Sequence, residues 1–126
     1  MDADTATRIV LSFLRAVEAR DLDLARGYTA PGFRMVFPGD SHYAVLEDLV
    51  EAAKSRYIRA IKRPERLDAA PHPDGTISVT CFGTLFGEWL DGTPYEGIRY
   101  CDWFLLRADG KILRQEVWND MALAKR

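Results

Sequence analysis

One carboxylate lies inside an otherwise apolar run, the segment RYCDWFLL at residues 99–106. The run is typical of a β-strand, which would carry Asp102 into the protein interior. A buried carboxylate without a partner costs several kcal/mol, or its pKa rises until the group is neutral. Asp102 is therefore either a structural acid held by a partner or an acid–base group that lines a pocket.

The next segment predicts the surroundings of Asp102. KILRQEVWNDM, residues 111–121, reads as a second strand after an ADG turn, and this hairpin would place Asp102 opposite Gln115. Alternation of side chains predicts which residues share the face of Asp102: Ile98, Tyr100, Phe104, Leu113, Gln115, Val117 and Asn119, with Phe82, Thr84, Phe86 and Glu88 from the preceding strand. Polar groups among aromatic rings indicate a small-molecule pocket, and a hydrogen-bonded core network is the alternative. No cation is expected on this face, so burial should raise the pKa of Asp102.

The opposite face is predicted to be equally apolar. It is expected to carry Val79, Cys81, Leu85, Trp89, Cys101, Trp103, Leu105, Ile112 and Trp118. Helices can cover one face of the sheet, and a second exposed apolar face would favour aggregation. We therefore expect a homodimer joined through the sheet face that bears Trp89, Trp103 and Trp118.

The elements that must position these residues follow from periodicity. Apolar residues at helical spacing predict a first helix, with Asp4 or Thr5 as its N-cap, and a short second helix capped by Asp21. A third helix is expected over 45–58, after a brief strand at 33–37. A weak strand at 66–71 and long strands at 76–90, 95–106 and 111–121 complete the chain. The prediction is one α+β domain over residues 1–126, with an antiparallel sheet and the helices on one face.

Composition excludes several classes of protein. The chain has 126 residues, is 48% hydrophobic and carries a net charge of −2 without a basic block, which argues against nucleic-acid binding. No apolar run reaches the roughly 18 residues that a membrane span needs. The start of the chain, MDADTATRIV, is acidic, unlike a secretory signal peptide. Cys81 and Cys101 match no metal-binding spacing, so we expect free thiols, no metal, no cofactor and a cytoplasmic location.

The order of elements, together with the segments GTLFGEWLDGTPYEG, DGKI and VWND, resembles the SnoaL-like branch of the nuclear-transport-factor-2-like superfamily. That superfamily includes ketosteroid isomerases, polyketide cyclases and scytalone dehydratases. The resemblance covers the whole chain. It implies a cone-shaped, cystatin-like α+β barrel, in which a strongly curved antiparallel sheet wraps three N-terminal helices around a deep pocket. It also implies dimerisation through the sheet.

The resemblance implies a reduced catalytic set. Asp102 falls where the ketosteroid isomerases keep a protonated pocket acid, and Tyr28 matches a secondary tyrosine of that pocket. Phe37 stands where their general base would be, and Phe13 replaces their oxyanion tyrosine, so steroid isomerisation by that mechanism is not expected. Polyketide cyclases of this kind need chiefly one acid, a role that Asp102 could fill.

The resulting hypothesis is a pocket for a small, largely apolar or aromatic molecule. A cofactor-independent isomerase, cyclase or dehydratase would use Asp102 as acid or base, with Tyr28, Phe37, Phe82, Thr84, Phe86, Tyr100, Gln115 and Asn119 around the ligand. The alternative is a non-catalytic binding or assembly module of the same fold. The sequence leaves open whether Glu88, His42 or Arg99 takes part in the site.

Overall fold

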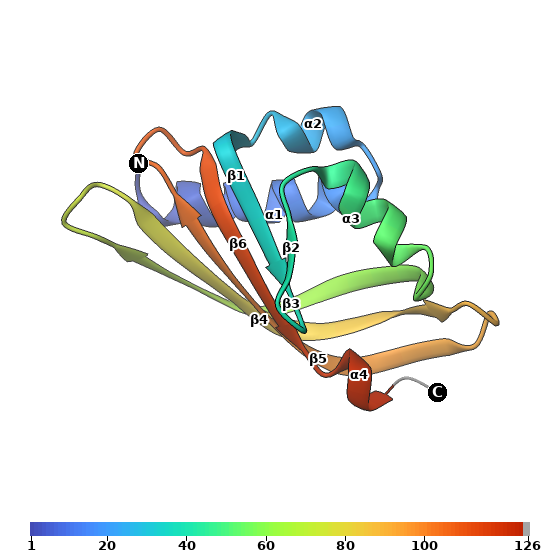
Figure 1. Ribbon diagram of the computed structural model, residues 1–126. Coiled ribbons are helices and arrows are strands. Elements are labelled where there is room, and N and C mark those ends of the chain that lie inside the picture. The colour runs from blue at the N-terminus through green and yellow to red at the C-terminus, as the bar shows by residue number, and fades with distance from the viewer. Residues whose placement is uncertain (125–126) are drawn as a thin grey trace.

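Three N-terminal helices lie on one face of a curved sheet in the computed structural model, which describes residues 1–124 (Figure 1). The helices are α1 (Ala3–Glu18), α2 (Leu22–Arg26), α3 (Leu46–Ala53) and a short C-terminal α4 (Met121–Ala124). The strands are β1 (Thr29–Phe37), β2 (Ser41–Tyr43), β3 (Tyr57–Pro71), β4 (Ile77–Trp89), β5 (Pro94–Leu106) and β6 (Ile112–Asn119). The predicted α+β class is confirmed.

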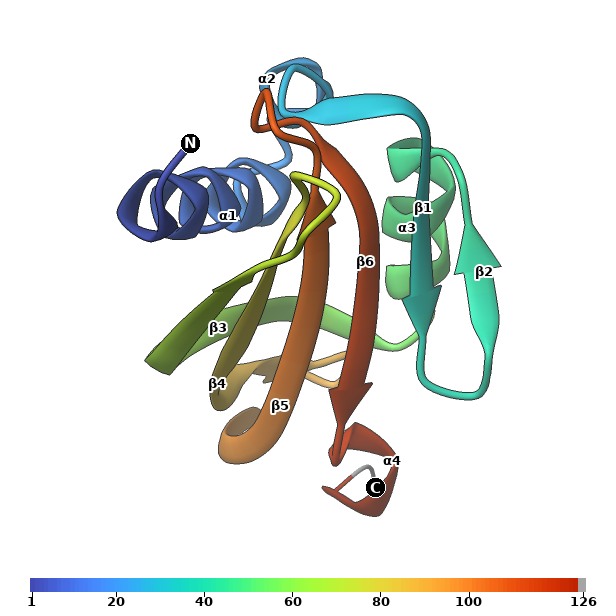
Figure 2. The ribbon, with the colours of Figure 1, turned by 90° about the vertical axis from the view of Figure 1, so that its left-hand side faces the viewer.

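The sheet is mixed and open, whereas an antiparallel sheet was expected. Its strand order is β2-β1-β6-β5-β4-β3, and β1 pairs with β6 in parallel while all other neighbours are antiparallel. The chain crosses from β2 through α3 to the far edge and returns strand by strand, so β6 arrives beside β1 in the same direction. Figure 2 shows the sheet bending around the space that α1 and α3 occupy.

Local capping fixes the two first helices. The side chain of Asp2, and not of Asp4 or Thr5, caps α1 by accepting a hydrogen bond from the Thr5 backbone N–H at 2.8 Å. Asp21 caps α2, as the sequence predicted. The apolar stripe of α1 is buried against the sheet at Ala6, Val10, Phe13 and Leu14.

The prediction for residues 45–71 is wrong in its boundary between helix and strand. The helix α3 ends at Ala53, and β3 begins at Tyr57 and pairs with β4 along nearly its whole length. The hydroxyl of Ser55 donates to the carbonyl oxygen of Ala52, and the β-branched Ile58 and Ile61 favour the strand. Pro64 is tolerated in β3 because the register shifts between Pro64 and Arg66.

The β5–β6 register differs from the prediction by two residues. Asp102 lies opposite Val117, and Phe104 lies opposite Gln115. A shift of two keeps every side chain on its predicted face, so Asp102 and Gln115 still share the inner face. An irregularity between Leu105 and Leu106 turns Ile112 inward, where it is fully buried, although the sequence placed it outside.

A bulge between β4 and β5 reverses the predicted faces of β4. Near the turn Gly87 pairs with Tyr95, but beyond the bulge Leu85 pairs with Ile98, so one extra residue has entered β5. Gly97, at this bulge, has a left-handed φ of 75°. Phasing from the turn alone therefore assigned β4 to the wrong face.

The corrected faces of β4 follow from its pairing. Cys81 pairs with Asp102, so Cys81, Val79 and Leu85 belong to the buried inner face that contacts the helices. Phe82, Thr84, Phe86 and Glu88 lie on the outer face, half-buried, together with Cys101 and Trp103. Cys81 and Cys101 are free and lie on opposite faces, contrary to their predicted similar phase.

The tryptophans do not share one face. Trp118 is 55% exposed and pairs with Cys101 on the outer face. Trp89 instead packs against the core and stacks on Tyr95, with ring centroids 4.4 Å apart. The predicted outer surface is therefore built around Trp103 and Trp118 without Trp89.

Two glycines of β4 allow β3 to approach closely. A Cβ atom on Gly83 would lie 2.2 Å from the carbonyl oxygen of Arg63, and one on Gly87 would lie 1.9 Å from that of Arg59. Side chains at these positions would separate the strands and displace Lys62, which lies between them on β3.

None of the helices within residues 1–124 is long and apolar enough to cross a lipid bilayer.

Candidate functional site

Asp102 is fully buried on the inner face of β5 and is held at one oxygen. Its Oδ2 atom contacts the ammonium group of Lys62 and accepts a hydrogen bond from Gln115 Nε2 at 3.2 Å. Its Oδ1 atom is buried and has no hydrogen-bond partner within residues 1–124. The carboxyl group is thus half satisfied, which keeps its protonation sensitive to Lys62.

Lys62 corrects the expectation that no cation shares this face. It lies on β3, pairs with Leu85 and therefore points to the inner face. Its side chain is 15% exposed, and its Nζ atom also lies 5.3 Å from the centre of the Tyr100 ring. The ammonium group is therefore placed between a carboxyl oxygen and an aromatic face.

The backbone of Lys62 is held by α1. Its N–H donates to Glu18 Oε2 at 2.8 Å, and its carbonyl oxygen accepts from Arg15 Nη1 at 3.0 Å. Arg15 and Glu18 also form an ion pair with each other at 2.7 Å. Because β3 is an edge strand, these side chains replace a missing neighbouring strand and fix Lys62 in place.

Burial raises the pKa of Asp102 above its ordinary value, and the charge and hydrogen bond of Lys62 and the hydrogen bond of Gln115 act against that rise. Burial also raises the pKa of the neighbouring Cys81 thiol and of Tyr100. These two groups contact each other, with 3.3 Å between Cys81 Sγ and Tyr100 Oη. The region around Asp102 therefore disfavours negative charge.

A cavity of about 90 Å³ lies between the helices and the inner face. Its wall is mostly apolar, formed by Phe13, Leu14, Val17, Phe37, Leu49, Ala53, Ala60, Leu85, Val117 and Met121. Its polar and charged lining residues are Glu18, Arg20, Arg56, Tyr57, Lys62, Gln115 and Asn119. Asp102 does not line it. Lys62 and Gln115 form the layer between Asp102 and the cavity.

The predicted site residues are divided between three places. Phe37, Gln115 and Asn119 line the cavity. Tyr100 lies behind the wall beside Lys62, and Tyr28 packs against the core but is not a hydrogen-bond partner of Asp102. Phe82, Thr84 and Phe86 lie on the outer face and are not part of this cavity, as the bulge in β5 explains.

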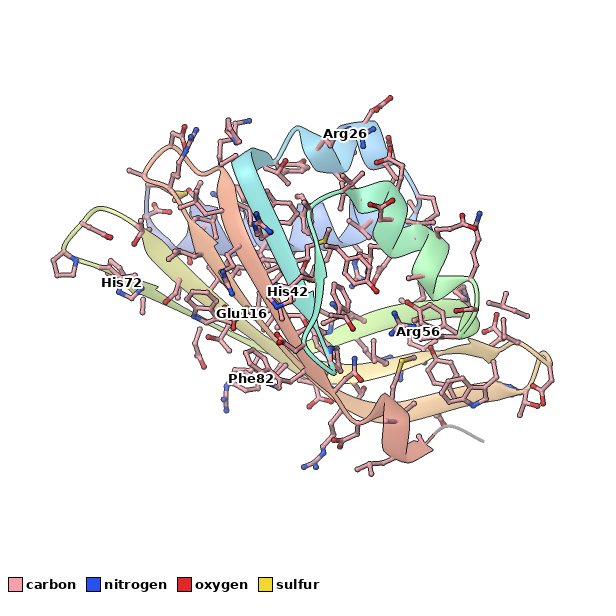
Figure 3. The ribbon with its side chains drawn as sticks, viewed as in Figure 1. Arg26, His42, Arg56, His72, Phe82 and Glu116 are labelled. Atoms are coloured by element: carbon pink, nitrogen blue, oxygen red, sulfur yellow. The ribbon has the colours of Figure 1, made fainter. Side chains whose placement is uncertain are left out.

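The residues left open by the sequence have partners outside the cavity. Glu88 pairs with Arg59 at 3.2 Å, and Arg99 pairs with Asp120 at 2.9 Å. His42, which lies in β2 (Figure 3), contacts Asp40 of the turn between β1 and β2 at 2.7 Å. Within the part of the chain that the structure describes, no three histidine, cysteine or acidic residues are grouped as a metal site.

Sequence reasoning missed Lys62, Glu18, Arg20 and Arg56. Lys62 was missed because residues up to 58 were predicted as helix, so the sequence did not assign the side chains of β3 to either face of the sheet. A usable signal was present: Arg59, Ile61 and Arg63 alternate with Ala60 and Lys62, which puts the lysine and the alanine on one face. A buried acid on the same face, two strands away on β5, then calls for that lysine as its partner.

Asp102 should make the free energy of unfolding depend on pH, and comparison with Asp102→Asn should reveal the direction of this dependence. Because its pKa in the folded protein is raised above the ordinary 3.8, its favourable contribution is complete below that value. The contribution is lost as pH rises from there through the folded pKa, by about 1.4 kcal/mol per pH unit at most. The free energy of unfolding of the wild type, measured with urea against Asp102→Asn, should therefore decline as pH rises above about 4.

Lys62→Met should extend that decline to higher pH, because it removes the cation that opposes the rise in the pKa of Asp102. Lys54→Met, on an exposed lysine, is the control and should leave the pH profile unchanged. A wild type that gains stability over Asp102→Asn with rising pH would show an ionised structural carboxylate instead.

Comparisons with known proteins identify the fold. No family model and no curated protein matches the sequence. Among solved structures, TerC co-crystallised with polyporic acid superposes with a TM-score of 0.77 at 18% identity, covering 95% of both chains. An NTF2-like protein of unknown function from Burkholderia pseudomallei gives 0.75 at 13% identity, covering 98% of this chain and 95% of that one. The orange carotenoid protein of Anabaena (Nostoc) sp. PCC 7120, binding canthaxanthin, gives 0.68 at 19% identity; the match covers 86% of this chain but 35% of that protein. The chain has the nuclear-transport-factor-2-like fold.

Proposed function

We propose that the protein binds a small, largely apolar molecule with an acceptor oxygen in the cavity between the helices and the sheet. The observation that carries the proposal is the placement of the Lys62 ammonium group and the Gln115 amide in a mostly apolar wall. Such a wall holds a ligand by burial and orients it through a few polar groups. Similar structures that contain polyporic acid or canthaxanthin support a ligand-binding use of this fold.

A second function, cofactor-independent proton transfer, is favoured by the pairing of Lys62 with a half-satisfied Asp102. One proton can move between Lys62 Nζ and Asp102 Oδ2, because burial disfavours the ionised carboxylate. Lys62 then faces a bound carbonyl compound, removes the proton from the carbon beside the carbonyl, and stabilises the enolate oxygen. Asp102 acts through Lys62, since it has no surface in the cavity. Phe13 and Phe37 supply apolar contact there and no acid or base.

Acetophenone in D₂O tests both functions without knowledge of the natural ligand. Binding should shift amide signals of Leu85 and Gln115 in ¹H–¹⁵N NMR spectra, and Val17→Phe should abolish the shifts by filling the cavity. If the protein moves protons, the methyl group of acetophenone should exchange with deuterium at least about tenfold faster than in buffer.

The variants separate binding from chemistry. Lys62→Met and Asp102→Asn should abolish the exchange, while Lys54→Met should retain it. Binding of acetophenone without deuterium exchange would show that the protein binds a ligand and does not transfer protons. Shifts that persist in Val17→Phe would contradict the cavity as the site.

We also propose that a second copy covers the outer face of the sheet. Phe82, Cys101 and Trp118 form a row across β4, β5 and β6, and Trp118 is 55% exposed. A groove beside this row also carries the acids Glu116 and Asp120. Arg66 and Arg63 on β3 lie over the rings of Phe82 and Phe86, at 4.3 and 4.4 Å. Glu116 and Asp120 pair with Arg114 and Arg99 of the same chain, so the proposed contact depends mainly on the apolar row.

Light scattering at micromolar concentration should give twice the chain mass of 14.3 kDa. Trp118→Asp should give the monomer mass, because a charge would replace the most exposed ring of the interface. Leu90→Asp is matched for exposure, at 54%, and lies outside this row, so it should remain dimeric. A monomeric wild type would refute the proposal.

A further inference from the structure

Two arginines line the cavity that the proposed ligand would enter. Arg20 lies directly after α1, and Arg56 lies in the turn between α3 and β3. Figure 3 shows Arg56 under α3, on the side of that helix that faces β3. Both approach the cavity from chain connections and so lie at its edge, away from the sheet floor that holds Gln115.

Neither arginine is neutralised by a carboxylate within residues 1–124. Arg20 Nη1 donates to the carbonyl oxygen of Val17 at 3.0 Å, and Arg56 Nη2 donates to Tyr43 Oη at 3.4 Å. The acid that lines the cavity, Glu18, is already used by Arg15 and by the Lys62 backbone. Because Lys62 is paired with Asp102, the excess of positive charge on the cavity wall comes from Arg20 and Arg56.

The backbone of Arg20 adds an independent observation. It adopts a left-handed φ of 60° just beyond the C-cap residue of α1, a position that glycine usually fills. A side chain there costs stability, and such strain is concentrated at ligand-binding sites. Here the strained residue is one whose side chain lines the cavity.

We infer that the ligand is an organic anion: a small apolar body that carries a carboxylate or an ionised enol. The inference rests on the proposed ligand-binding function and names its substrate class. The anionic group lies between Arg20 and Arg56, whose planar guanidinium groups match a pair of carboxylate oxygens. The apolar body enters the cavity, whose volume of about 90 Å³ limits it to roughly one ring.

Benzoate and benzamide test the inference because they differ in charge but hardly in shape. In ¹H–¹⁵N NMR titrations, benzoate should bind at least about tenfold more tightly than benzamide, and its affinity should fall with added NaCl. Arg20→Gly and Arg56→Met should each remove most of this preference, because each weakens benzoate binding more than benzamide binding. Arg8→Met, on the exposed side of α1, is the matched control and should retain the preference.

Arg20→Gly also separates a binding role from a structural one. Because glycine adopts the left-handed backbone freely, this variant should raise Tm by a few degrees while it weakens benzoate binding. Equal affinity for benzoate and benzamide, or a charge preference that both variants retain, would overturn the inference and leave the proposed function standing. Failure of both compounds to bind at millimolar concentration would contradict both.

Discussion

A buried carboxyl group with one partnered and one unpartnered oxygen is the constraint on which the inner face of the sheet depends. Asp102 has no exposed surface, so its charge is tolerated only through Lys62 and Gln115. Lys62 reaches it because Gly83 and Gly87 let β3 lie close to β4, and because Arg15 and Glu18 hold the backbone of Lys62. The helix α1, the edge strand β3 and the glycines of β4 therefore all help to place Lys62 against Asp102.

This contact also determines what the cavity offers a ligand. Without Lys62, the cavity wall beside Asp102 would offer only the neutral amide of Gln115, and no charged group would connect Asp102 to a bound molecule. With Lys62 the cavity has a cationic group that is paired with a buried acid. The arginines at the edge extend the same sign of charge outward, so the field inside the cavity favours an anionic or electron-rich group.

The sequence predicted the fold class, the helices α1 and α2, and the shared face of Asp102 and Gln115, because these depend on local periodicity and on parity within one hairpin. The prediction failed where one inserted residue reverses the face of the sheet on which the following side chains lie. Because of the bulge at Gly97, Phe82, Thr84 and Phe86 lie on the outer face and Trp89 on the inner face, opposite to the prediction. The parallel pairing of β1 with β6 depends on a long-range crossover through α3, which no local pattern encodes. Lys62 was missed because the predicted helix ended at residue 58 and the next predicted strand began at residue 66, and because its partner Asp102 lies 40 residues away.

Hydrogen exchange of the Lys62 side chain, observed in ¹H–¹⁵N spectra tuned to lysine ammonium groups, tests the central contact most directly. An ammonium group held against Asp102 and shielded by α1 should give a signal under conditions in which exposed Lys54 has exchanged with water, and the signal should disappear in Asp102→Asn. If Lys62 exchanges as fast as Lys54, or if its signal survives in Asp102→Asn, the buried pair does not exist in solution and the proposed site loses its basis.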